Sequence, residues 1–168
     1  MIIGLILVLG FLVFSSVKPG LTPIEPEEVH YHAGFQVYKD NILQDFSGLE
    51  YMHVAPCSED EHEEPHSPEE EQLERAHLHD NIDDVVHVHR DGASWGDLFT
   101  NIKVEVNPDK VYINGKLLEK DFLSYPIGVY DSAVVFVGRN TEIEDKLAGA
   151  VIKEHIIEAE NKSESCGN

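Results

Sequence analysis

The chain has 168 residues, 42% of them hydrophobic, which is enough for one packed domain with additional segments. Its formal net charge of -20, from 32 acidic and 12 basic side chains, argues against nucleic acid or an anionic lipid surface as a partner. The same charge concentrates cations near the protein, although it is equally typical of a solvated acidic surface. Two cysteines, Cys57 and Cys166, are too few for a disulfide scaffold or a paired-cysteine zinc site; one long-range disulfide and an unpaired Cys166 both stay open.

An uninterrupted apolar stretch opens the chain, from Ile2 to Val17. As a helix it would span roughly 24 Å, somewhat less than the bilayer core of about 30 Å. We predict a membrane anchor over residues 1–18 that holds the rest of the chain outside the cytoplasm; a cleaved signal segment and a buried core helix are the alternatives. Lys18 taken alone favours the opposite topology. Residues 19–28 contain three prolines and are typical of an extended linker.

A single α+β domain is predicted over residues 29–160. Its first element is a strand from Val29 to Tyr38, which the turn signal Lys39-Asp40-Asn41 joins to a second strand from Ile42 to Phe46. Tyr51 to Val54 is a candidate short strand.

An acidic loop insertion follows over residues 57–75. Between Glu59 and Glu74 lie nine acidic residues and no basic one, so this segment cannot bury itself. A short helix from Glu69 to Ala76 is compatible with its sequence.

Two further elements follow the insertion. A strand is predicted from Val85 to Arg90, and a short helix from Trp95 to Ile102, with Ser94 as its N-cap and Asp97 at the third helical position. One apolar face of this helix is formed by residues at i, i+3, i+4 and i+7, namely Trp95, Leu98, Phe99 and Ile102.

The last third of the domain begins with a hairpin, in which Asn114-Gly115 joins Lys110–Ile113 to Lys116–Leu118. Ala133 to Val137 is predicted as a central strand. A C-terminal helix is then predicted from Glu142 to about Glu160, because apolar residues recur there at helical spacing. Residues 161–168 form the predicted tail.

The segment from Val111 to Gly138 resembles the C-terminal half of a β-grasp domain of the ubiquitin-like, sulfur-carrier type. The resemblance lies in the Asn-Gly hairpin, the Tyr125-Pro126 loop and Asp131 before the last strand. It implies a mixed sheet with one short crossing helix, to which this chain adds a His-rich hairpin, the acidic insertion and a C-terminal helix. It does not imply sulfur-carrier activity, because those carriers end in Gly-Gly and this chain ends Cys-Gly-Asn.

Six of the ten histidines form three His-x-His pairs. Because alternate side chains of a strand point to the same face, each pair offers two imidazoles at a spacing suited to one metal ion. Neutral imidazole suits zinc and copper among other transition metals. The pairs are His30 with His32, His77 with His79, and His87 with His89.

Two of these pairs lie in the segment from Ala76 to Arg90, on either side of a turn signal at Asp80-Asn81 or Asp83-Asp84. We predict a hairpin whose four imidazoles converge on one face as a zinc or copper site. Asp80 and Asp84 could bind the ion or orient the imidazoles as hydrogen-bond acceptors. The alternative is a half-exposed polar face whose histidines respond to pH.

The remaining histidines are less informative. His53 beside Met52 is either a soft copper-ligand pair or a plain edge-strand residue. His62 and His66, within the acidic insertion, either collect metal weakly or belong to a solubilising loop. His155 is expected to be structural or solvated.

The His-x-His modules and the short helix after them also resemble a group of uncharacterised small exported proteins with an N-terminal anchor. This resemblance implies that the matching residues form one module, but it implies no particular reaction. The matching residues are His30, His32, His77, His79, Asp80, His87, His89, Gly96, Asp97 and Phe99.

These observations predict an extracytoplasmic, membrane-tethered protein that binds copper or zinc. A zinc-dependent hydrolase is one alternative, although no His-Glu-x-x-His motif is present. A β-grasp module that binds a protein partner, with incidental metal binding, is the other. A closed set of ligands favours binding, whereas an open position beside a general base favours catalysis.

Overall fold

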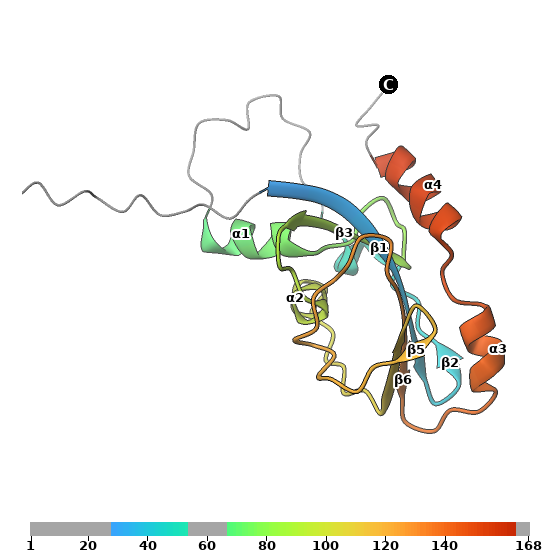
Figure 1. Ribbon diagram of the computed structural model, residues 1–168. Helices are drawn as coiled ribbons and strands as arrows, with labels where there is room; N and C mark the ends of the chain where they lie inside the picture. Colours follow the sequence, from blue (N-terminus) through green and yellow to red (C-terminus); the bar gives the residue numbers. More distant parts are fainter. Residues whose placement is uncertain (1–27, 54–66, 164–168) are drawn as a thin grey trace, which may run out of the picture.

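The computed structural model describes residues 28–53 and 67–163 (Figure 1). The predicted anchor, most of the linker, the first part of the acidic insertion and both cysteines lie outside these residues. Within the described part of the chain, no helix is both long and apolar enough to cross a membrane.

The described residues form an α+β structure around a mixed six-stranded sheet, in agreement with the predicted α+β class. Its main path runs β2-β1-β6-β4-β5, with the central pair β1 and β6 parallel and the other neighbours antiparallel. The bounds are β1 Glu28–Lys39, β2 Ile42–Leu43, β4 Lys110–Ile113, β5 Lys116–Leu117 and β6 Ser132–Val137.

Strand β3 (Val85–Arg90) lies off this path and pairs antiparallel with the first half of β1. Gly34 of β1 pairs with Val85 of β3 on one side and with Ser132 of β6 on the other. Strands β3 and β2 therefore lie on the same edge of β1, β3 along its first half and β2 at its end. The register places His32 opposite His87, and a bulge lies between Glu28 and Tyr31.

Two-residue turns close the first and the last of the three predicted hairpins. Asp40 and Asn41 have φ of 50° and 70°, and Asn114 and Gly115 have φ of 52° and 73°. Asn, Asp and Gly tolerate this left-handed conformation, which matches the twist of the strands. Strand β2 ends at Leu43, earlier than the predicted Phe46, because the chain turns inward there and buries the Phe46 ring in the core.

One face of the sheet carries the main hydrophobic core. Helix α2 (Trp95–Asn101) packs there with three buried side chains, Trp95, Leu98 and Phe99, as its apolar pattern predicts. Ser94 and Asp97 form the predicted capping box, in which each side chain binds the other's backbone N–H. Figure 1 shows α1 (Pro68–Arg75) and α2 on this side of the sheet and α3 and α4 on the other.

The predicted single C-terminal helix is wrong: the chain forms α3 (Ile143–Ala148) and α4 (Lys153–Ser163) with a break between them. Helix α3 ends at Gly149, because glycine has a low helix propensity. The break lets Val151 turn onto the sheet, where it packs with Ile156 as part of a second, smaller core. Of the candidate strand from Tyr51 to Val54, Tyr51 belongs instead to a 3-10 helix, Leu49–Tyr51, Met52 makes a single bridge to Leu78, and Val54 lies outside the described residues.

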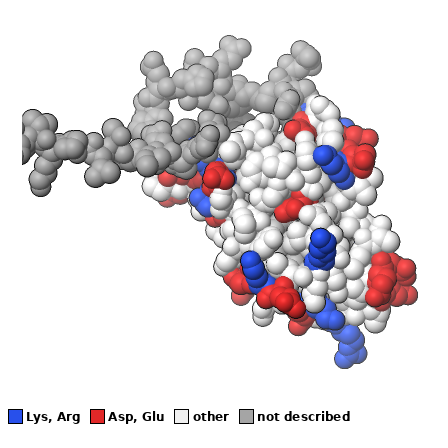
Figure 2. Space-filling view, viewed as in Figure 1, with Lys and Arg blue, Asp and Glu red and all other residues white. Residues whose placement is uncertain are grey.

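Charged side chains are dispersed over the face seen in Figure 2, where those of Lys and Arg lie singly among acidic ones. This face therefore presents no clustered basic surface for a polyanion.

The contact between Gly34 and Val151 sets the distance between β1 and the segment that precedes α4. A Cβ on Gly34 would lie 2.5 Å from Cγ1 of Val151. We expect Gly34→Ala to lower the free energy of unfolding by about 1–3 kcal/mol through overpacking. In the double variant with Val151→Ala, the cost should be smaller than the sum of the two single costs. Urea unfolding of the four proteins measures this coupling, and simple additivity would rule the contact out as a constraint.

Candidate metal centre

Three histidines stand in a row across three adjacent extended segments. His32 of β1 pairs with His87 of β3, and the backbone N–H groups of His87 and His77 each donate to the other's carbonyl at 2.9 Å. Their neighbours Ala33, Val86, Val88, Ala76 and Leu78 all belong to the main core. Because side chains alternate along a strand, the imidazoles lie on the opposite face of the sheet, the one that α4 covers.

Helix α1 delivers His77 to this row. Ser67 caps α1 through a capping box with Glu70, and the amide of Asn101 donates to the carbonyls of Gln72 at 2.8 Å and Ala76 at 2.7 Å. The helix therefore ends at a defined point on α2, from which the chain continues in extended form along β3.

The hairpin predicted over residues 76–90 forms only in part. The chain reverses at Asp80-Asn81, whose φ values of 59° and 56° suit a tight turn. Only His77 pairs with β3 across this turn, because α1 occupies the chain up to Arg75 and leaves few extended residues. The main partner of β3 is β1 instead.

A chain of imidazole ring contacts links seven histidines, with centroid separations of 4.2 to 5.7 Å. His53, for which the sequence left a copper ligand and an edge-strand residue open, joins this chain: its ring lies 4.9 Å from that of His77. The seven are His30, His32, His53, His77, His79, His87 and His89.

His32, His79 and His87 form the tightest group. Nε2 of His32 lies 3.1 Å from Nδ1 of His87, and Nε2 of His79 contacts the same Nδ1 atom. One ligand atom from each of the three lies within 4.8 Å of the others. The ring of His87 is tilted by 59° from that of His32 and by 50° from that of His79. Rings tilted in this way can aim their nitrogen lone pairs at one shared point.

Asp80 orients His79 within this group. Its carboxylate accepts a hydrogen bond from Nδ1 of His79 at 2.6 Å, so Nε2 is the nitrogen of His79 that faces His87. Nε2 of His32 and Nδ1 of His87 share a second hydrogen bond, so three ring nitrogens meet there with one proton between them. A metal cation in that place would bind all three nitrogens instead of that proton, and a carboxylate behind a ligating imidazole is the usual support for such a ligand.

Two of the three residues are buried, and each has a ring nitrogen without a hydrogen-bond partner in the described part of the chain: Nδ1 of His32 and Nε2 of His87. His32 is 2% exposed and His87 6% exposed. Burial, with neighbouring imidazoles as a smaller cause, lowers the pKa of His32 to about 4 and holds the pKa of His87 far below its ordinary value. Both rings are therefore neutral at pH 7, the state in which imidazole binds metal.

A second group shares His87 and adds His30 and His89, again with one ligand atom from each within 4.8 Å. The three rings are nearly parallel, with angles of 17° between His30 and His87 and 6° between His87 and His89. His30 is exposed and His89 half-buried. A common ion would require these two rings to turn, and the terminal ring torsion of His is broad.

The structure thus brings five of the six predicted ligands into these two groups and leaves His77 beside them. Nδ1 of His77 donates to the carbonyl of Leu73 at 2.9 Å, and its ring stacks on that of His87. Asp84 contacts Nε2 of His155 on α4 at 2.9 Å, rather than an imidazole of the two groups. The candidate collecting residues His62 and His66 lie outside the described residues.

Helix α4 covers the group and leaves little space. A hollow of about 10 Å³ lies among His32, His79, Ile82, Val85 and Ala159. That volume holds one water molecule. The sequence could not identify Ala159 as part of this cover, because a small apolar residue on a helix has no distinctive signal.

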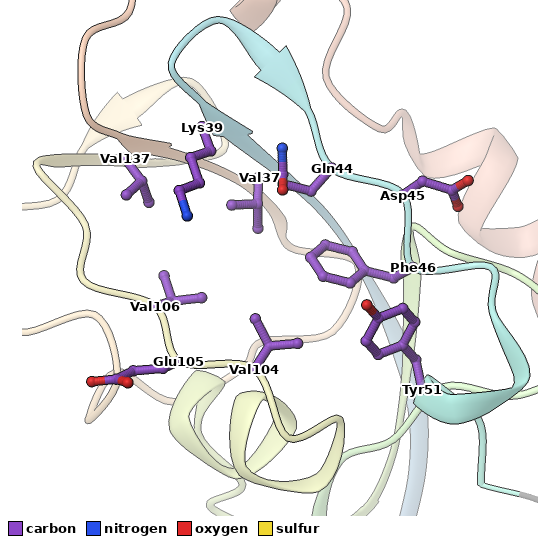
Figure 3. Close-up of a pocket in the computed structure, with 10 residues that line it drawn as sticks. All are labelled: Val37, Lys39, Gln44, Asp45, Phe46, Tyr51, Val104, Glu105, Val106 and Val137. Atoms are coloured by element: carbon purple, nitrogen blue, oxygen red, sulfur yellow. The ribbon is translucent and has the colours of Figure 1, made fainter.

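A larger hollow of about 160 Å³ lies beyond the cluster, between the end of β1 and the chain after α2 (Figure 3). Val37, Phe46 and Val104 point into it, with Lys39 and Glu105 at its edge. Its lining includes no imidazole, so it is separate from the candidate metal centre.

Comparison with known proteins returned no match: no family model, no curated protein and no solved structure is similar to this chain.

The buried neutral imidazoles predict an acid-sensitive fold in the metal-free protein. The pKa of His32 is about 4 and that of His77 about 3 in the folded state, against 6.5 for an ordinary histidine. The unfolded chain therefore binds more protons below pH 6.5. The free energy of unfolding should stay level above that pH and fall toward pH 4, by up to about 1.4 kcal/mol per pH unit for each histidine. Urea unfolding in the presence of a chelator measures this slope, and equal stability at pH 7 and pH 5 would contradict it.

Proposed function

We propose that the protein binds a transition-metal ion, copper or zinc, through His32, His79 and His87. The observation that carries this proposal is the convergence of one ring nitrogen from each of three histidines, two of them buried and one half-buried, with Asp80 behind His79. Hydrogen bonds alone cannot satisfy this arrangement, and the unpartnered Nδ1 of His32 and Nε2 of His87 add to the deficit. The acidic composition of the chain favours cations in general.

The three donors are imidazole nitrogens, which suit zinc and copper. Magnesium and calcium are hard cations that take oxygen ligands, so the donor set does not favour them. Two nitrogens bound at 2.0–2.1 Å to one tetrahedral ion lie roughly 3.3 Å apart, and the separation of 3.1 Å between His32 and His87 is close to this. Little movement of these two rings would therefore be needed to accept the ion, whereas the ring of His79 would have to draw back from His87.

The small space at the group favours binding over catalysis. A hydrolase needs room for a substrate beside the metal-bound water, and the hollow of about 10 Å³ is enough for one water only. This supports a role in holding, delivering or sensing metal over the alternative of a zinc-dependent hydrolase.

A β-grasp-like fold and membrane tethering complete the proposal. The β-grasp resemblance implies a mixed sheet with one helix packed across it, and the mixed sheet of the described residues, with α2 on one face, supports this part of the proposal. The apolar stretch from Ile2 to Val17 supports an anchor that places the metal centre outside the cytoplasm. Fractionation of cells, followed by protease treatment of intact cells, tests that location.

The main test is a metal titration of the full chain with Cu(II) and Zn(II), beside a variant with His32, His79 and His87 changed to Ala. The wild type should bind metal stoichiometrically at neutral pH, and the variant should lose tight binding because its ligands are gone. Circular dichroism and cooperative unfolding show that the variant still folds. The control variant, with His62 and His66 changed to Ala, tests whether loss of any histidines weakens binding. Its metal affinity should equal that of the wild type. A wild type without stoichiometric copper or zinc would refute the proposal.

Asp80→Asn tests the support of His79 without removing a ligand. The amide cannot hold Nδ1–H as strongly as the carboxylate does, so metal affinity should fall by about 10-fold or more. A competition titration with a coloured chelator measures the change. Asp83→Asn, in the same loop, removes equal charge but leaves the hydrogen bond between His79 and Asp80 in place. Equal losses in the two variants would assign the effect to net charge alone.

A further inference from the structure

His87 is the one residue common to both histidine groups. Its Nδ1 atom faces His32 and His79, while its Nε2 atom is buried and has no hydrogen-bond partner among the described residues. The two nitrogens point away from opposite sides of the imidazole ring. A single ion on the Nδ1 side would therefore leave the Nε2 side still to be satisfied.

The ring of His87 also contacts two further imidazoles. The rings of His30 and His89 stack on it with centroids 4.4 Å away, and they lie 5.1 Å from each other. Each of the three residues offers a ligand atom within 4.8 Å of the other two. The buried Nε2 atom and these two imidazoles, once their rings turn, are a donor set for a second cation that shares only His87 with the first group.

We infer that the centre binds two transition-metal ions, with the imidazole of His87 as the bridge between them. The inference rests on the proposed function, because the first ion is the one held by His32, His79 and His87. His30 and His89 hold the second ion together with His87. The first ion binds Nδ1 of His87 in the neutral tautomer that carries its proton on Nε2. The second ion displaces that proton to water, and the imidazolate then bonds both ions.

The second site differs from the first in accessibility. His30 is exposed and His89 half-buried, whereas His32 and His87 are almost fully buried. The second ion therefore binds and leaves from the surface, next to the first half of β1, and it binds more weakly than the first because two rings must turn to reach it. The two sites fill in sequence as metal rises.

Titration of the full chain with Cu(II), followed by stoichiometry and electron paramagnetic resonance (EPR), tests the inference. The wild type should bind two ions, and its EPR signal per copper should be largest at one equivalent and fall at the second, because a bridging imidazolate couples the two spins. The variant with His30 and His89 changed to Ala should bind one ion with an undiminished signal. Both residues lie at or near the surface, so this variant keeps the fold.

The remaining variants separate the possible failures. The variant with His62 and His66 changed to Ala should still bind two coupled ions; loss of the second ion there would place that ion elsewhere and overturn the inference. A wild type that binds one ion, or two ions without coupling, would also overturn it while leaving the proposed function standing. Absence of any tight copper would refute the proposed function itself.

Discussion

The pairing of β3 with the first half of β1 is the contact on which the histidine cluster depends. It sets His32 opposite His87. On the other edge of β3, His87 also pairs with His77. A shift of one residue would turn these imidazoles into the main core and would expose Val86 and Val88. The apolar residues that alternate with the histidines therefore fix the position of the polar ones, since the core tolerates one register only.

The His-x-His spacing could be interpreted without a structure because it states which side chains share a face. It cannot state which segments become neighbours. For this reason the sequence predicted the hairpin between His77 and His89 as a local pair of strands, whereas β3 found its main partner far away in β1. His53 joins the cluster through a tertiary contact with His77, for which a single histidine beside a methionine provides no specific signal.

Local signals with a defined stereochemistry were predicted most accurately. The capping box of Ser94 and Asp97 and the Asn114-Gly115 turn depend on a few neighbouring residues, and both formed as expected. The final helix failed for the opposite reason. Its apolar positions keep helical spacing through Gly149, yet the packing of Val151 on Gly34 outweighs the continuity of that pattern.

The separation of His32 and His87 along the chain has a consequence for the folding of the protein. The two residues are 55 positions apart, and their ring nitrogens lie 3.1 Å from each other. An ion that holds both closes a long loop, as a disulfide would, and binds the unfolded chain much more weakly than the folded one. The supply of metal would then determine how long β3 stays on the sheet, so that an apoprotein would lose this edge first during turnover and a loaded protein would resist proteolysis there.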